Sequence, residues 1–130
     1  MRQEIEQLLH ERAVAVKAKD IEKAGAFYET DLRVFDLVNP LERAGSDGVK
    51  ERLAEWVASF KEIKDYSFTG LEIDGNADFV ICSLFDHVEA IKPDGSSLDM
   101  WWRETLGLQK KNGKWLIIHT HASVPFDPAN

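Results

Sequence analysis

Four charged residues stand at positions where the hydrophobic pattern of this sequence calls for apolar side chains. They are Arg12, Asp36, Asp86 and Glu104. Glu104 is the only polar residue on the apolar face of residues 98–108, which alternate as a strand does, and Asp86 breaks the same alternation in residues 80–90. Asp36 shares a face with the apolar residues of the segment 32–37, and Arg12 falls on the helical core stripe of residues 5–16. These residues are the first candidates for chemistry.

Buried carboxylates need a physical reason to persist, because burying one without a partner costs several kcal/mol. Such a group is paired, or it holds its proton through a raised pKa, or it lines a wet cavity. One interpretation is a structural ion pair of Arg12 with Glu104 or Asp86 that fills the core. The other is a pocket, because one arginine cannot pair with three carboxylates and the remaining acids are suited to proton transfer. We favour the pocket.

Aromatic residues complete the expected pocket wall. Trp102 faces inward by the same alternation as Glu104 and could bound the cavity. Tyr28, near the expected end of a second helix, either donates its hydroxyl into the pocket or keeps its tip in water. Trp56 lies on a helical core stripe, where it packs in the core or contacts a ligand.

The histidines are weaker candidates. His119 and His121 share a strand face with Trp115, and this spacing binds zinc or iron only when a third ligand converges. Neither a cysteine cluster nor a helical histidine pair is present, so we expect no metal and no other cofactor. His87 and Asp86 are neighbours on a strand and point to opposite faces, which excludes a catalytic dyad. His87 is expected at the surface or at a subunit interface.

Helical periodicity in the first half of the chain predicts three helices. The first covers roughly residues 2–18, and Asp20 can cap a short second helix that carries Phe27 and Tyr28. A third helix is expected after Ser46 or Asp47. Its apolar stripe consists of Val49, Leu53, Trp56, Val57 and Phe60.

Strand patterns dominate the rest of the chain. Residues 32–37 alternate as a strand that ends at Asn39-Pro40. From Tyr66 onward four β-rich stretches are separated by turn residues at 74–76, 93–95 and 112–113. We therefore predict an α+β fold, with the helices segregated from an antiparallel meander.

Composition limits the partners. The 130 residues suit a single domain over residues 1–130, and the formal charge of −7, without a basic run, argues against nucleic acid. Cys82, the only cysteine, cannot form an internal disulfide. No segment approaches the roughly 20 apolar residues of a membrane helix, and the N-terminus lacks a signal-peptide pattern. We expect a cytoplasmic protein that does not bind membranes.

The chain resembles the SnoaL-like superfamily, which includes ketosteroid isomerase and the association domain of calcium/calmodulin-dependent kinase II. The resemblance is carried by the passage from Lys17 to Asp36 and by the ending Glu104-Thr105 with residues 113–123, and it spans nearly the whole chain. It implies a cystatin-like, nuclear transport factor 2-like cone, in which three N-terminal helices pack on a strongly curved antiparallel sheet. The pocket would lie at the open end, and the outer sheet face would form a dimer.

The resemblance also implies roles for the charged residues. Asp36 falls at the carboxylate that shuttles the proton in ketosteroid isomerase, and Glu104 falls at the neutral acid that holds the oxyanion. Arg12 replaces the tyrosine of that site, so we predict a different enolate chemistry in which Arg12 stabilises the anion or only neutralises Glu104. Asp86 and Leu106 replace two arginines of the kinase domain, which argues against its ligand specificity. Both would contact the substrate.

Two functions remain open from the sequence. The first is an acid–base isomerase, cyclase or dehydratase for a small organic substrate, with Asp36 as base, Arg12 and protonated Glu104 as anion stabilisers and Asp86 orienting the substrate. The second is a non-catalytic domain for ligand binding or oligomerisation. For either function we expect a homodimer through the outer sheet face. The residues that suggest this interface are Trp101, Arg103 and Trp115.

Overall fold

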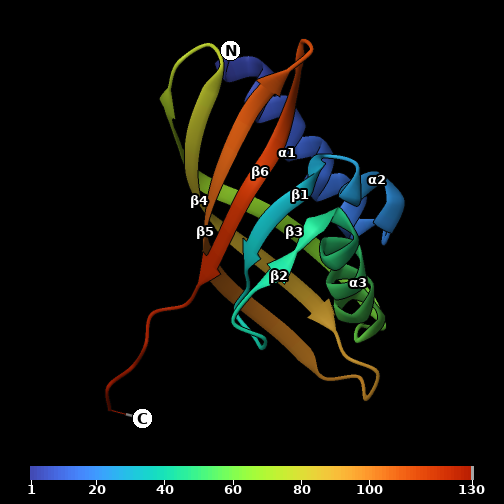
Figure 1. The fold of residues 1–130 in the computed structure, drawn as a ribbon. Coiled ribbons are helices and arrows are strands. Elements are labelled where there is room, and N and C mark those ends of the chain that lie inside the picture. Colours follow the sequence, from blue (N-terminus) through green and yellow to red (C-terminus); the bar gives the residue numbers. More distant parts are fainter. Residues whose placement is uncertain (130) are drawn as a thin grey trace.

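The computed structural model describes residues 1–129 and folds three helices against one side of a curved six-stranded sheet (Figure 1). The helices are α1 (Arg2–Lys17), α2 (Ile21–Gly25) and α3 (Gly45–Ala58). The strands are β1 (Tyr28–Phe35), β2 (Arg43–Ala44), β3 (Glu62–Gly75), β4 (Phe79–Ile91), β5 (Ser97–Lys111) and β6 (Lys114–Ser123). The predicted α+β class and the three N-terminal helices are confirmed.

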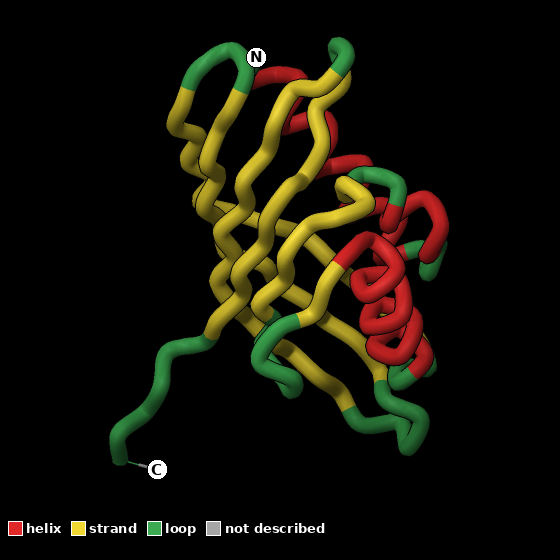
Figure 2. The backbone as a smooth tube through the Cα atoms, in the orientation of Figure 1, coloured by secondary structure: helices red, strands yellow, loops and turns green. Residues whose placement is uncertain are grey.

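The sheet has the order β2-β1-β6-β5-β4-β3. Strands β3 to β6 form the predicted antiparallel meander, and their long, curved path around the helices is visible in Figure 2. The parallel pairing of β1 with β6 and the two-residue strand β2 were not predicted. Neither feature has a local sequence signal. Strands β1 and β6 lie far apart in the sequence, and β2 is too short to show alternation.

The helix ends correct two predictions. The Asp20 carboxylate caps α2 by accepting the backbone N–H of Lys23, as predicted. However, α2 ends at Gly25, so Tyr28 begins β1 instead of lying near the end of a helix. Helix α3 begins at Gly45 after Ala44, without a side-chain cap, so the caps predicted at 46 or 47 are wrong.

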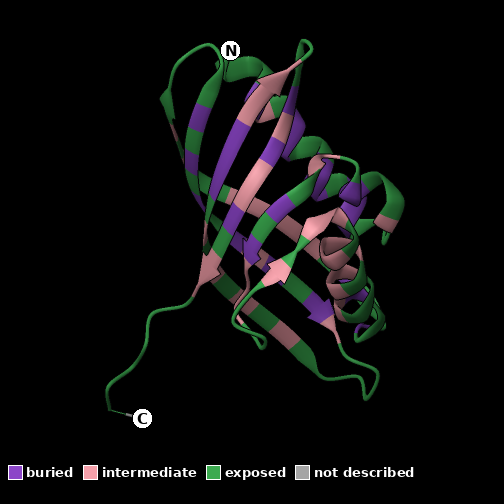
Figure 3. Cartoon of the chain, viewed as in Figure 1, coloured by how far each residue is buried: buried purple, intermediate pink, exposed green. Residues whose placement is uncertain are grey.

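The core lies between the helices and the inner face of the sheet. Alternate residues of β4 are buried from Val80 to Ala90, and the odd positions face outward, as the alternation predicted (Figure 3). Trp115 is also in this core, where its Nε1–H donates to Glu4 of α1 at 2.7 Å. The placement of Trp115 on the outer dimer face is therefore wrong.

A β-bulge in β6 reverses which residues of that strand face inward. Leu108 of β5 pairs with Ile117 and Gly107 pairs with His119, so Ile118 is an extra residue in the ladder. Beyond the bulge, His119 and His121 leave the face of Trp115 and contact the edge of the Phe35 ring. The predicted shared face of the histidines and Trp115 is wrong, because simple alternation cannot anticipate an inserted residue.

Within residues 1–129, no helix is long and apolar enough to cross a lipid bilayer.

Candidate functional site

Three of the four candidate charges lie in a row across the inner face of the sheet. Glu104 of β5 pairs with Ala122 of β6, and Asp36 directly follows the Phe35–His121 pair, which places it beside Ala122. Two strand spacings separate Asp36 from Glu104, or roughly 10 Å between their backbones. Asp86 of β4 lies diagonally from Glu104, because it pairs with Trp102. The small Ala122 side chain leaves space between Asp36 and Glu104.

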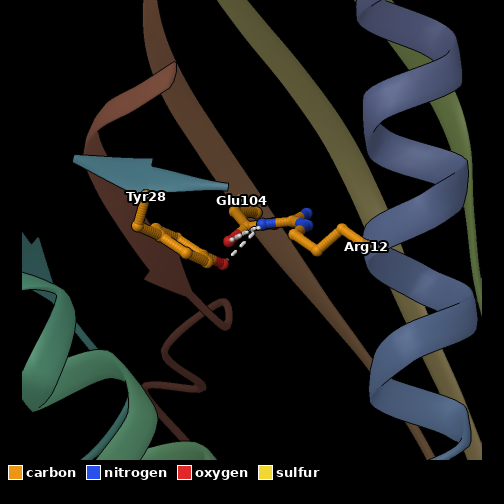
Figure 4. Close-up of polar contacts among 3 residues, drawn as sticks. All are labelled: Arg12, Tyr28 and Glu104. Carbon is orange, nitrogen blue, oxygen red and sulfur yellow. Dashed lines mark hydrogen bonds and ion pairs between the residues drawn. The ribbon is translucent and has the colours of Figure 1, made fainter. Parts of the chain in front are cut away.

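Arg12 reaches this row from helix α1. Its Nη2 donates to Glu104 Oε1 at 2.7 Å, and its Nη1 contacts Glu104 Oε2 at 3.4 Å and donates to the Tyr28 hydroxyl at 3.0 Å (Figure 4). The Arg12 side chain is only 4% exposed. Arg12 thus holds Glu104 through two contacts to its two carboxylate oxygens. Burial raises the pKa of Tyr28, so its hydroxyl keeps a hydrogen to donate.

Asp86 is the neutral acid of the site. It is fully buried, and burial, followed by the neighbouring Glu104, raises its pKa to about 9 although Arg12 acts in the opposite direction. Within the described part of the chain, its Oδ2 has no hydrogen-bond partner. From the sequence we predict the protonated acid at Glu104. In the structure Glu104 pairs with Arg12, and the acid whose pKa is raised is Asp86.

Asp36 has a partner of its own. Its Oδ2 accepts from Arg52 Nε of helix α3 at 3.1 Å, and its Oδ1 accepts the backbone N–H of Leu37 at 2.6 Å. Both side chains of this ion pair remain about one-fifth exposed. Asp36 is therefore a carboxylate that is held in place and reached by solvent.

A cavity of about 450 Å³ joins these groups. Six residues selected from the sequence line it, namely Arg12, Tyr28, Asp36, Trp56, Trp102 and Glu104. Trp56 and Trp102 meet edge to face with ring centroids 5.9 Å apart, and Tyr66 packs against both rings. The cavity thus combines an aromatic wall with charged groups, as small-molecule sites commonly do.

Two predicted contact residues do not line the cavity. Leu106 is completely buried in the hydrophobic core, where it packs with other apolar side chains of the sheet. Asp86 is buried beside Glu104 and Trp102 and is not among the residues that line the cavity. Alternation identified both as inward-facing, but it could not tell the solid core from the hollow end of the sheet.

Four polar residues of the cavity wall were not predicted from the sequence, namely Arg43, Arg52, Tyr66 and Thr120. Arg52 had a usable signal, because it stands four residues before Trp56 on the same helical stripe. Arg43 had none, since its inward direction follows from the pairing of β2 with Val34 on the inner face of β1. Among the described residues, no group of three or more metal-ligating side chains converges.

Comparison with known proteins identifies the family. A model of the SnoaL-like domain matches residues 5–127, so the chain belongs to the SnoaL-like family. A search of curated proteins found no match.

Solved structures share the fold. A nuclear transport factor 2-like protein of unknown function from Pseudomonas putida is 24% identical, with a TM-score of 0.83 over 97% of this chain and 87% of that one. A candidate calcium/calmodulin-dependent protein kinase II association domain from Xanthomonas campestris is 18% identical, with a TM-score of 0.83 over 96% and 88%. A cystatin-like protein from Nostoc punctiforme is 19% identical, with a TM-score of 0.77 over 98% and 92%. The cystatin-like fold is therefore shown, whereas such identities carry no activity.

Proposed function

We propose that this protein binds a small, flat organic molecule in the cavity and moves a proton on it, as an isomerase, cyclase or dehydratase does. The observation that carries the proposal is the placement of the Asp36 carboxylate and the Tyr28 hydroxyl on one cavity whose wall is aromatic. A base and a hydrogen-bond donor on one apolar space are the minimum for making and holding an enolate.

Each group has a defined part in this chemistry. Asp36 removes a proton from a carbon next to a carbonyl group, and the electron pair moves to the carbonyl oxygen. Tyr28 donates its hydroxyl hydrogen to that oxyanion, because the Tyr28 oxygen already accepts from Arg12 and is polarised by it. Glu104 acts as a positioning residue that holds Arg12. The substrate contacts proposed for Trp56 and Trp102 follow from their place on the cavity wall.

Hydrogen exchange into a model ketone tests the proposal without knowledge of the natural substrate. We expect the protein to accelerate exchange of the α-hydrogens of 2-tetralone in D₂O, followed by NMR. Asp36→Asn should slow the catalysed exchange by about 100-fold or more, because it removes the base and keeps the shape. Tyr28→Phe should slow it by a similar factor through loss of the oxyanion donor. The matched control is Asp31→Asn. Asp31 is an exposed acid of β1, and its variant should catalyse the exchange at the original rate.

A second function, binding without catalysis, is favoured by one observation. Both carboxylates that face the cavity already have arginine partners, Asp36 with Arg52 and Glu104 with Arg12, so neither is a free base. If the protein binds 2-tetralone but exchange proceeds at the uncatalysed rate, the result would reject the enzyme and support a binding domain.

A further inference from the structure

The charges that line the cavity do not balance. Three arginines, Arg12, Arg43 and Arg52, face two carboxylates, Asp36 and Glu104. Arg12 pairs with Glu104 and Arg52 pairs with Asp36, which leaves the Arg43 guanidinium without a carboxylate partner within residues 1–129. The cavity therefore carries one surplus positive charge in a chain whose formal net charge is −7.

The Arg43 side chain is also short of hydrogen-bond acceptors. Its Nη2 donates to the Asn39 backbone carbonyl at 3.3 Å, but its Nε is buried and has no partner among residues 1–129. A buried donor without an acceptor is uncommon in folded proteins and costs free energy, so protein groups alone do not satisfy this guanidinium. Because Arg43 pairs with Val34 on the inner face of the sheet, its guanidinium group belongs to the cavity wall.

We infer that the ligand of this cavity is a flat monoanion, a carboxylate whose oxygens bind the Arg43 guanidinium while its ring packs against Trp56 and Trp102. The inference rests on the proposed function for the existence of a ligand, and it adds the chemical class. A carboxylate fits because guanidinium and carboxylate are both planar and can form two parallel hydrogen bonds. One surplus charge matches one anionic head, whereas a phosphate dianion would leave negative charge unpaired.

The position of Arg43 also orients the ligand. Val34, the residue opposite Arg43 on β1, lies two residues before Asp36, which directly follows that strand. An anionic head at Arg43 therefore holds the opposite side of a planar ligand toward the aromatic wall and Tyr28. The carboxylate binds and aligns the ligand, and Arg43 takes no part in moving the proton.

Calorimetric titration with two probes of nearly equal shape tests this inference. The probes are 2-naphthoate and 2-naphthamide, which differ in charge at one group. We expect 2-naphthoate to bind at least about tenfold more tightly, because a charge-assisted hydrogen bond contributes about 1.5–3 kcal/mol and each tenfold corresponds to 1.4. Added salt should weaken the binding of 2-naphthoate more than that of 2-naphthamide.

Variants then assign the preference to Arg43. Arg43→Met should remove the preference for 2-naphthoate and change the affinity for 2-naphthamide less than about twofold, while Arg43→Lys should keep part of it. Arg2→Met is the matched control, since Arg2 forms an exposed pair with Glu6 ten residues before Arg12 and should alter neither affinity. The melting curve of each variant shows whether it folds. If Arg43→Met does not fold, the reduced preference of Arg43→Lys for 2-naphthoate still tests the inference.

Two results would overturn the inference, namely equal affinity for the two probes or a preference that survives in Arg43→Met. Both are distinct from failure of the proposed enzyme, because titration requires no turnover. Exchange of 2-tetralone with no preference for 2-naphthoate would reject the anion and keep the enzyme. A preference for 2-naphthoate that depends on Arg43, without exchange of 2-tetralone, would keep the anionic ligand and reject the enzyme.

Discussion

Asp86 illustrates how one buried residue makes stability depend on pH. Below about pH 4 the Asp86 carboxyl is protonated in both the folded and the unfolded chain. As pH rises toward the folded-state pKa of about 9, the unfolded chain releases this proton and the folded chain keeps it. The folded state is thereby disfavoured by up to about 1.4 kcal/mol per pH unit until the folded pKa is passed.

Asp86→Asn should remove this pH dependence, because asparagine has the shape of the protonated acid and no proton to lose. We expect the free energy of unfolding of the variant, relative to the original chain, to increase steadily from pH 5 to pH 8. Urea unfolding at several pH values measures it, with the exposed Asp74→Asn as a control that should follow the original chain. A constant difference between Asp86→Asn and the original chain would mean that Asp86 is ionised in the folded protein.

At the scale of elements, one short segment supplies two of the three cavity arginines. Arg43 lies in β2 and Arg52 in α3, and Gly45 connects them at the start of the helix. Gly45 has φ +78°, and a Cβ built on it would lie 2.9 Å from the Thr30 carbonyl oxygen. The segment thus requires glycine for both its backbone conformation and its close approach to β1.

Gly45→Ala should therefore destabilise the fold more than the same change at Gly95. Gly95 has φ +88° but nothing within 4 Å of a built Cβ, so Gly95→Ala carries only the backbone strain of roughly 1–2 kcal/mol. Gly45→Ala adds the steric contact with Thr30, which we expect to cost about 1 kcal/mol or more beyond that. Urea unfolding of both variants measures the difference. Equal losses would show that β1 and α3 separate easily.

At the scale of the molecule, the outer face of the sheet exposes a patch of large apolar side chains. They are Phe79, Ile81, Phe85 and Trp101. The four lie on the neighbouring strands β4 and β5, and His87 stacks on the Trp101 ring at 4.3 Å while bonding to Asp99 at 2.7 Å. Contiguous exposed apolar area of this kind is typical of an interface.

We propose that this patch forms the homodimer expected from the sequence, with Trp101 retained and Trp115 removed from the interface. Sedimentation at micromolar concentration should show a dimer, and Phe85→Lys should shift it toward monomer because an unpaired ammonium group would be buried on each side of the interface. Leu41→Lys is the control, since Leu41 is 96% exposed in a loop outside the sheet. A monomer in the original chain, or an unchanged dimer in Phe85→Lys, would contradict the interface.

The sequence was sufficient wherever the deciding interaction was local. Alternation placed Asp86 and Glu104 on the inner faces of β4 and β5, and the Asp20 cap marked the start of α2. Strand parity and capping depend on neighbouring residues only, so a single sequence contains all the information that they need. The resemblance to the SnoaL-like family added the correct fold around these elements.

Tertiary structure alone decided which charges meet and which acid keeps its proton. Glu104 is 92 residues from Arg12 along the chain, and burial beside this pair raises the pKa of Asp86 to about 9. Likewise, the extra residue at Ile118 and the inward direction of Arg43 follow from strand pairing. Pairing, burial and the resulting pKa shifts depend on elements that approach one another across the whole fold, and no local pattern of residues records that approach.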